Sequence, residues 1–236
     1  MNMLVSGIIA AGGTGTRLGE QEPKQFLDLG GKPVIAWSLE AFSFASEIGE
    51  IILVSPVDYV EKATKYAEKY CIGKTFHVVT GGASRQESVL NGLKASSRNL
   101  NWVAVHDAAR PFVTSQEVDS VCLMARDVGA AIAAAKIVDT VKEVHSQIIT
   151  RTLDRSVLVS ALTPQVCRKD DLLSAYEVAS QTGFKATDEA SLLENAGISV
   201  AVYFGSSLNF KITTSTDLQI ARAVAQYLEG HDTSES

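Results

Sequence analysis

Short apolar runs alternate with longer helix-like segments along the 236-residue chain. Several runs are apolar at successive positions rather than at every second position, as in strands that are covered on both faces. This alternation predicts an α/β fold, in which a mostly parallel sheet lies between layers of helices. The expected strands are Leu4–Ala10, Glu50–Ser55, Thr75–Thr80, Trp102–Asp107, Ala130–Val138 and Ile198–Phe204. The expected helices are Val34–Ala45, Val57–Tyr70, Arg85–Ser97, Ser115–Val128, Asp170–Gln181, Glu189–Ala196 and Thr216–Leu228.

The stretch 139–160 (DTVKEVHSQIITRTLDRSVLVS) interrupts this alternation. It is too rich in β-branched side chains for a helix, and it predicts two short strands with a turn near His145–Gln147. A protruding hairpin with apolar side chains usually needs a partner surface. We therefore favour an arm that contacts a second subunit over one that folds back on its own domain. The chain contains no linker or repeat, which predicts a single domain over residues 1–236 with the arm at approximately 139–160.

The composition is that of a soluble globular protein, with 46% hydrophobic and 20% charged residues. A net charge of -6 argues against broad binding of nucleic acid or of anionic membranes. The three cysteines lack CxxC spacing and the four histidines are scattered, so the sequence predicts neither a disulfide framework nor a metal cluster. Neither a membrane span nor a signal peptide is recognisable. We expect a cytoplasmic protein, or a plastid stromal one if this is a mature organellar chain.

A glycine-rich stretch, AGGTGTRLGEQEPKQ (residues 11–25), follows the first expected strand. Glycines allow the backbone to turn tightly and to approach a ligand, and the N–H groups of such a turn form a nest for anions. The spacing matches neither the GxGxxG fingerprint nor the GxxxxGK[ST] loop. The stretch therefore indicates a phosphate site of another kind, and a plain tight turn is the alternative.

Two cations, Arg17 and Lys24, belong to the same stretch. A triphosphate that undergoes substitution at phosphorus needs cations on its oxygens as charge redistributes. A guanidinium can bridge two phosphate oxygens, and a lysine adds a compact charge. We interpret Arg17 and Lys24 as these cations, with a solvated surface pair as the alternative.

Two later motifs place polar residues next to expected strands. GGASRQESV (residues 81–89) puts Arg85 and Ser88 at a helix N-terminus, which favours anions, although a simple capped helix has the same pattern. VHDAARPF (residues 105–112) puts Asp107 at the carboxyl end of a central strand, where ligands bind in open α/β sheets. A carboxylate there can approach Mg²⁺ or a sugar hydroxyl. A turn closed by a salt bridge to Arg110 is the alternative.

Three short motifs follow in the C-terminal part: TPQ (163–165), ATDEAS (186–191) and NFKITT (209–214). They contribute Thr163, Thr187, Asp188 and Lys211 as candidates. Thr187 or Asp188 can also simply cap the helix that follows. Lys211 lies in a short apolar stretch, where a lysine requires an anionic partner.

The chain resembles the 2-C-methyl-D-erythritol 4-phosphate cytidylyltransferase family of bacteria and plastids in the order and spacing of AGGxGxR…PKQ, GGxxRxxSV, VHDAARP, a DT…DR hairpin, TPQ, TDEAS and NxKIT. The resemblance runs from Gly7 to about Val224. It implies a Rossmann-like, glycosyltransferase-A-type nucleotidyltransferase domain whose arm interlocks two subunits of a homodimer. It also implies the reaction of CTP with methylerythritol phosphate to give the cytidine diphosphate alcohol and pyrophosphate, with Mg²⁺ or another divalent cation.

The resemblance further implies roles for individual residues. The residues implied to bind the nucleotide are Ala11, Gly12, Gly13, Gly15, Gly82, Arg85, Ser88 and Asp107, with Asp107 also near the metal, directly or indirectly. The implied catalytic cations are Arg17 and Lys24 on CTP and Arg155 and Lys211 on the acceptor phosphate. The residues implied to line the acceptor site are Ala108, Arg110, Thr140, Thr163 and Thr187.

Three other functions share part of this pattern. A ribitol-5-phosphate cytidylyltransferase shares the glycine loop, HDAxRP and NxKIT, but TDEAS and GGxxRxxSV favour the methylerythritol enzyme. A sugar-1-phosphate nucleotidylyltransferase does not predict the arm, and a binding module without catalysis does not need the four cations. The sequence departs from the family's usual pattern at Gly12, where many members have alanine, and at Phe210, where a smaller aliphatic residue is common.

Overall fold

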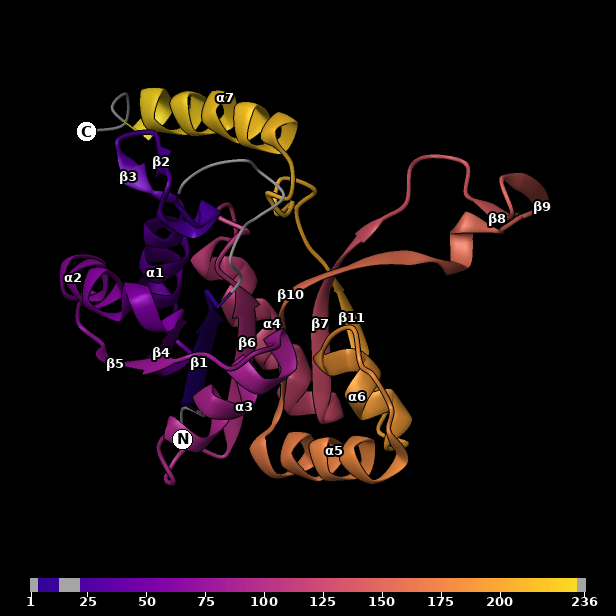
Figure 1. Cartoon of the computed structure of the whole chain (residues 1–236), viewed down its shortest axis with the longest axis horizontal. Helices are drawn as coiled ribbons and strands as arrows, with labels where there is room; N and C mark the ends of the chain where they lie inside the picture. The colour runs from indigo at the N-terminus through magenta and orange to yellow at the C-terminus, as the bar shows by residue number, and fades with distance from the viewer. Residues whose placement is uncertain (1–3, 13–21, 233–236) are drawn as a thin grey trace.

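The computed structural model describes residues 4–12 and 22–232, and its centre is a seven-stranded sheet in the order β11-β7-β10-β6-β1-β4-β5 (Figure 1). All neighbouring strands are parallel except β10, which runs antiparallel to both β6 and β7. The predicted mostly parallel α/β sheet is therefore confirmed. The strands are β1 (Val5–Ala10), β4 (Ile48–Ser55), β5 (Thr75–Thr80), β6 (Trp102–Asp107), β7 (Ala130–Lys136), β10 (Val159–Arg168) and β11 (Ala201–Phe204).

Helices cover both faces of the sheet. One hydrophobic cluster joins the sheet to α1, α2 and α4, and a second joins it to α3, α5 and α6. Ile8 belongs to the second cluster and Ile9 to the first, because successive strand residues point to opposite faces. This two-sided burial accounts for the continuous apolar runs. The helices are α1 (Val34–Phe44), α2 (Val60–Tyr70), α3 (Arg85–Ala95), α4 (Ser115–Val128), α5 (Lys169–Thr182), α6 (Glu189–Asn195) and α7 (Ser215–Asp232).

Smaller elements complete the fold. The short strands β2 (Asp28–Leu29) and β3 (Lys32–Pro33) form a hairpin, and α7 packs on this region through a third cluster that includes Leu29 and Leu218. Single 3₁₀ turns, η2 (Lys24–Phe26), η3 (Val57–Tyr59) and η4 (Arg155–Val157), lie in the connections. No helix in the described ranges combines the length and apolarity that a bilayer span requires.

Strand β10 was not predicted, and its position is the main correction to the expected fold. Its first residues, Val159 and Ser160, were assigned to the arm, but they pair with Lys136 and Ala135 of β7. Pro164 lacks an N–H and argues against a central strand. The structure accommodates it by a register shift between Ala161 and Gln165, so that the strand continues on both sides of the irregularity.

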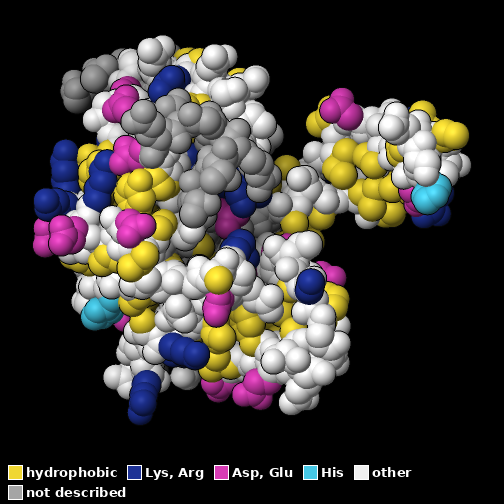
Figure 2. All heavy atoms as spheres, in the orientation of Figure 1, with side chains coloured by type: hydrophobic (Ala, Val, Ile, Leu, Met, Phe, Trp, Pro, Cys, Tyr) yellow, Lys and Arg dark blue, Asp and Glu magenta, His cyan; other side chains and the backbone are white. Residues whose placement is uncertain are grey.

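The predicted arm is confirmed as a hairpin that leaves the sheet between β7 and β10. Its strands are β8 (Lys142–His145) and β9 (Ile148–Thr152), and positive φ values at Ser146 and Gln147 form the tight turn between them. Figure 1 shows the arm extending away from the domain, so it does not fold back on its own chain. Figure 2 shows apolar side chains gathered on it. The most exposed are Val138, Val144, Ile148, Ile149 and Val157, at 55–79% of their full exposure.

Candidate active site

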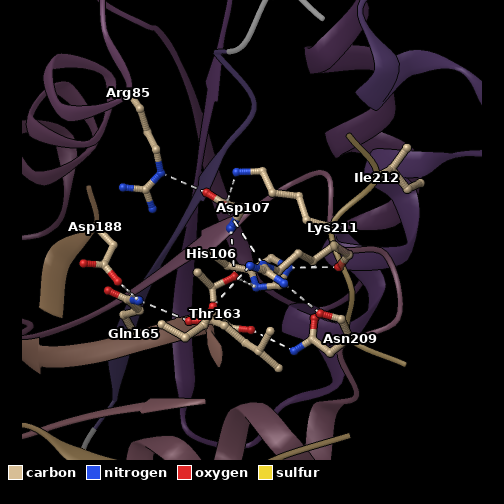
Figure 3. Close-up of polar contacts among 12 residues, drawn as sticks. Arg85, His106, Asp107, Thr163, Gln165, Asp188, Asn209, Lys211 and Ile212 are labelled. Carbon is tan, nitrogen blue, oxygen red and sulfur yellow. Dashed lines mark hydrogen bonds and ion pairs between the residues drawn. The ribbon is translucent and has the colours of Figure 1, made fainter. Parts of the chain in front are cut away.

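Asp107 lies at the centre of a cluster of cations at the carboxyl end of β6. Its Oδ1 accepts a hydrogen bond from Arg85 Nε at 3.0 Å, and its Oδ2 accepts one from Lys211 Nζ at 2.7 Å (Figure 3). Arg110 Nε lies 3.9 Å from the same Oδ2. Burial would raise the pKa of the Asp107 carboxyl, but the charges of Arg85 and Lys211 hold that pKa far below its usual range. The carboxylate is therefore ionised and joins Arg85 and Lys211, from distant parts of the sequence, with Arg110, three residues further along the chain.

Arg85 is held by a second carboxylate that the sequence did not single out. Its Nη1 and Nη2 donate to Glu189 Oε1 and Oε2 at 2.7 and 2.8 Å, the bidentate geometry that gives strong pairs. Glu189 is only 1% exposed and is the first residue of α6. The ATDEAS motif contains this residue, but only Thr187 and Asp188, which precede it, are named as candidates in the sequence analysis. Arg85, placed near the nucleotide by the resemblance, is thus fixed between α6 and β6.

The segment that carries Lys211 is bound to the turn after β6. The Ile212 N–H donates to the Ala109 carbonyl at 2.9 Å, and Arg110 Nη1 donates to the Asn209 carbonyl at 2.9 Å. Lys24 Nζ donates to the Ile212 carbonyl at 2.6 Å. The predicted catalytic cation Lys24 therefore contacts the segment that carries a second one, Lys211, from the opposite end of the sequence.

The loops after β1 and β5 meet at Ser88. The Gly82 N–H donates to Ser88 Oγ at 3.0 Å, and a Cβ added to Gly12 would lie 2.8 Å from that oxygen. An alanine methyl at position 12 would require the Ser88 hydroxyl to shift, so the two loops approach each other closely at this point. Ala11 is buried, and its carbonyl accepts a hydrogen bond from Gln25 Nε2 at 2.5 Å. The described nucleotide-site candidates of the first loop therefore lie beside those of the GGASRQESV motif.

Several predicted residues lie beside this edge, and others lie outside the described ranges. The Ala108 N–H donates to the Ala10 carbonyl at 3.1 Å, which joins the ends of β6 and β1. Thr163 Oγ1 accepts from the Asp107 N–H at 3.1 Å and is buried behind it. Phe210 packs on Phe112 with 5.8 Å between ring centroids, which gives its large side chain a structural role. Gly13, Gly15 and Arg17 fall in the stretch 13–21, outside the described residues.

The TPQ and ATDEAS motifs meet through Gln165, another residue that was not singled out. Gln165 Nε2 donates to Asp188 Oδ2 at 2.9 Å, and Gln165 Oε1 accepts from the Ala190 N–H at 2.8 Å. Asp188 caps α6 together with Ser191, as one of the two alternatives predicted. Thr187 precedes the cap and is exposed. The contacts of Gln165 connect β10 to the start of α6 and so support Glu189.

Thr140 and Arg155 belong to the arm, and a single copy of the chain does not bring them to Asp107. Both residues are exposed, and the Arg155 guanidinium donates to the carbonyl of Val138 within the arm. Figure 1 shows that the arm carries this region away from the sheet. The roles that the resemblance implies for these two residues therefore stay predictions.

The described residues fit a divalent cation whose coordination comes chiefly from a bound phosphate compound rather than from protein side chains. They contain no group of three or more His, Cys, Asp or Glu side chains with the geometry of a metal site. Asp107 has both oxygens in ion pairs, but each carboxylate oxygen has a second lone pair. Asp107 therefore fits a metal ion to which it adds one oxygen, or a bound water, while phosphate oxygens supply the other ligands.

Glycine loops and converging cations at the carboxyl edge of a mostly parallel sheet define a nucleotide-binding α/β enzyme of the nucleotidyltransferase class. The family model for 2-C-methyl-D-erythritol 4-phosphate cytidylyltransferase, IspD, matches residues 5–227. The chain belongs to this family, which confirms the resemblance and the class of enzyme.

Individual relatives are similar to this chain over nearly their whole length. The 2-C-methyl-D-erythritol 4-phosphate cytidylyltransferase of Syntrophus aciditrophicus is 41% identical, with 98% of this chain and 99% of the relative covered. That of Halalkalibacterium halodurans is 39% identical, with 94% and 97% covered. Among solved structures, the 4-diphosphocytidyl-2C-methyl-D-erythritol synthase of Anaerococcus prevotii superposes with a TM-score of 0.85 at 31% identity, covering 96% of this chain and 100% of that one.

Proposed function

We propose that this chain transfers the cytidylyl group of CTP to 2-C-methyl-D-erythritol 4-phosphate, giving 4-diphosphocytidyl-2-C-methyl-D-erythritol and pyrophosphate. Membership of the family supports this acceptor, and the relatives described above are named for it, which disfavours ribitol 5-phosphate. The observation that carries the proposal within the structure is the convergence of Lys24, Lys211 and Arg110 on the edge where Asp107 lies.

The reaction joins two anions, and this determines what the site must supply. An oxygen of the acceptor phosphate forms a bond to the α-phosphorus of CTP, and the bond from that phosphorus to the leaving pyrophosphate oxygen breaks. Repulsion opposes the encounter, so cations are required on both reactants. The acceptor phosphate is already deprotonated at pH 7, so it needs no general base. The proposed chemistry therefore needs no catalytic histidine or cysteine, and the sequence predicts none at this edge of the sheet.

We assign the cations to the two reactants on the basis of their positions. Lys24, which follows the glycine-rich loop, acts with Arg17 on the phosphates of CTP. Lys211 and Arg155 hold the acceptor phosphate for in-line attack, and Arg110 lies beside them. The hydrogen bond from Lys24 Nζ to the Ile212 carbonyl supports this arrangement, because it brings Lys24 to the segment that carries Lys211.

We propose Mg²⁺, or another divalent cation, as the cofactor. Bound to CTP, it would neutralise phosphate charge and polarise the phosphoryl oxygens. Asp107 is the residue that we assign to it, directly or through a water molecule. Arg85 and Lys211 would continue to orient the Asp107 carboxylate.

We also propose that the enzyme is a homodimer joined by the arm. An isolated two-stranded hairpin is marginal in water, and this one exposes five large apolar side chains that a second copy can cover. The dimer would bring Arg155 and Thr140 to the partner's acceptor site. We place the enzyme in the cytoplasm, which the bacterial origin of the relatives supports, or in the plastid stroma if the chain is organellar.

Pyrophosphate release tests the proposed function. Purified protein is incubated with CTP, Mg²⁺ and either methylerythritol phosphate or ribitol 5-phosphate. We expect kcat/KM to favour methylerythritol phosphate by ~10³ or more, because a site that pairs with one set of hydroxyls leaves buried polar groups unpaired with another. A preference for ribitol 5-phosphate would keep the nucleotide chemistry and overturn the proposed acceptor. Omission of the divalent cation tests the cofactor in the same assay.

A further inference from the structure

His106 is a fully buried polar residue next to Asp107 in β6. Successive residues of a strand point to opposite faces, so its imidazole lies on the face away from the Asp107 carboxylate. There it packs on Phe42 of α1, with 5.2 Å between ring centroids. A buried imidazole needs partners for both ring nitrogens, and the identity of those partners shows what His106 holds.

Both nitrogens are bound to residues of the proposed acceptor site. Nδ1 lies 2.9 Å from Thr163 Oγ1 (Figure 3). Nε2 lies 3.1 Å from the Arg110 carbonyl oxygen. Ser38 Oγ is a more distant neighbour of Nε2, at 3.4 Å. The imidazole therefore connects β10 to the turn that follows β6.

The chemistry of these partners determines the tautomer. A carbonyl oxygen only accepts, so Nε2 carries the proton and donates it to Arg110. Nδ1 is then an acceptor, and the Thr163 hydroxyl donates to it. The same hydroxyl oxygen accepts from the Asp107 N–H, so both hydrogen-bonding functions of Thr163 are used within the protein. The hydroxyl proton of Thr163 is directed toward His106 and away from the substrate side.

Two lines of contact lead from His106 to the segment that carries Lys211. The first runs through Arg110, whose Nη1 donates to the Asn209 carbonyl at 2.9 Å. The second runs through Thr163, whose carbonyl accepts from Asn209 Nδ2 at 2.8 Å. Asn209 is itself fully buried and lies two residues before Lys211. Both hydrogen bonds of the imidazole thus converge on the backbone that directs Lys211.

We propose that His106 is a positioning residue of the acceptor-phosphate site. It touches no substrate. It fixes the Arg110 backbone and the Thr163 side chain, and through Asn209 it orients Lys211 toward the acceptor phosphate. This inference rests on the proposed function, because the acceptor phosphate is the group that Lys211 is assigned to hold, with Arg110 beside it. Loss of the imidazole contacts is expected to weaken the acceptor more than CTP.

Three substitutions separate the two hydrogen bonds of the ring. His106→Phe keeps a ring of similar size and removes both bonds. His106→Asn places an amide oxygen near the Nδ1 position and can retain the bond from Thr163, whereas His106→Gln places an amide nitrogen near Nε2 and can retain the bond to Arg110. Phe42→Leu is the matched control, because it disturbs the same packing and leaves the hydrogen bonds in place.

The readout is the KM for each substrate, with kcat and the free energy of unfolding measured in parallel. For His106→Phe we expect the KM for methylerythritol phosphate to rise by ~10-fold or more, while the KM for CTP changes by less than ~3-fold, since one or two buried hydrogen bonds are lost. His106→Asn and His106→Gln should each recover part of the loss. Phe42→Leu should lower stability without this selective effect.

Each other result overturns the inference. An equal rise in both KM values, or a selective rise in Phe42→Leu as large as in His106→Phe, would show that His106 acts only through packing. If His106→Phe does not fold, a normal acceptor KM in both amide variants and in Thr163→Val would equally exclude the role. Failure of the wild-type protein to use methylerythritol phosphate would instead contradict the proposed function, so the two failures are distinguishable.

Discussion

Lys211 Nζ lies 2.7 Å from Asp107 Oδ2, although 104 residues separate the two in the chain. Asp107 ends a central strand, and Lys211 lies in the connection that leads to α7. The Asp107 side chain is 11% exposed and that of Lys211 is 35% exposed, so solvent reaches the lysine more readily than the carboxylate. The buried Asp107 carboxylate therefore directs Lys211 to the carboxyl edge of the sheet. Lys211 is the lysine that we assign to the acceptor phosphate.

Lys211→Met should separate the charge of this lysine from its packing. We expect kcat/KM to fall by ~10² or more, because a charge-assisted contact to the acceptor phosphate is lost. The free energy of unfolding should change by less than ~1 kcal/mol, since Asp107 keeps Arg85 as its partner and Lys211 is partly exposed. Steady-state kinetics and urea denaturation measure the two quantities. A large loss of stability with unchanged kinetics would make the role of Lys211 structural.

Lys24→Ala should lower turnover far more than nucleotide binding. Lys24 follows the glycine-rich loop, and we assign it to charge that develops on the α-phosphate during transfer. We expect kcat to fall by ~10² or more and the dissociation constant for CTP to change by less than ~3-fold. Single-turnover kinetics and calorimetric titration with CTP provide the test. Lys69→Ala, an exposed lysine of α2, is the control and should leave both quantities unchanged.

Arg155→Ala should weaken the acceptor selectively, and mixing experiments can show which subunit supplies this arginine. If the arm reaches the partner's site, a mixed dimer of Arg155→Ala and Lys211→Met subunits contains one site in which both residues are intact. Random co-assembly then restores about one quarter of wild-type activity, because half of the dimers are mixed and each has one active site.

The control for this experiment pairs Arg155→Ala with a subunit that carries both substitutions. No site in that mixture combines Arg155 with Lys211, so activity should stay at the level of the variants. Restoration in neither mixture would mean that Arg155 acts within its own subunit or not at all. Sedimentation at the assay concentration establishes whether the protein is the expected dimer.

Glu117→Gln should stabilise the protein at neutral pH. Glu117 of α4 is 5% exposed, its Oε1 accepts from Asn209 Nδ2 at 3.3 Å, and its Oε2 has no partner among the described residues. Burial raises the pKa of Glu117 above its usual value, although the Asn209 contact opposes the shift. The folded state therefore binds the proton more tightly than the unfolded state does, so stability is lost as pH rises through the folded pKa.

The quantity to measure is the difference in the free energy of unfolding between Glu117→Gln and the wild type, and its sign is the test. The glutamine variant carries no charge to bury, and we expect it to exceed the wild type by ~1 kcal/mol in urea denaturation at pH 8. The difference should shrink as pH falls toward the unfolded-state pKa of the carboxyl. Glu177→Gln, on an exposed position of α5, should show no such pH dependence. A glutamine variant that is less stable at pH 8 would contradict the assigned burial penalty.

Much of the fold follows from local sequence pattern. The apolar runs at Val5–Ala10 and Trp102–Asp107 became neighbouring central strands, and the β-branched stretch after Lys136 became the arm. Helices α3 and α4 each begin after a capping residue, with the side chains of Ser84 and Thr114 accepting from the backbone N–H groups of Glu87 and Glu117. These features are determined locally, because burial on one or two faces and the satisfaction of a helix end depend on a few adjacent residues.

The motifs also indicated where the site would be. Glycine loops and an aspartate after expected strands predicted a phosphate-binding edge, and the order of the motifs identified the family. Gly13, Gly15 and Arg17 lie outside the described residues, so their placement stays a prediction. The roles of the arm residues likewise stay predictions, because they depend on a second copy of the chain.

The tertiary structure alone decided which distant groups meet. Strand β10 inserts antiparallel between β6 and β7, and local pattern did not predict it because the strand contains Pro164 and continues directly from the arm. That insertion places Thr163 against His106, while the docking of α6 brings Glu189 to Arg85. The residues adjacent to a given residue in the sequence indicate whether that residue is buried. Its hydrogen-bond partners are determined by how whole elements pack, which no short stretch of sequence contains.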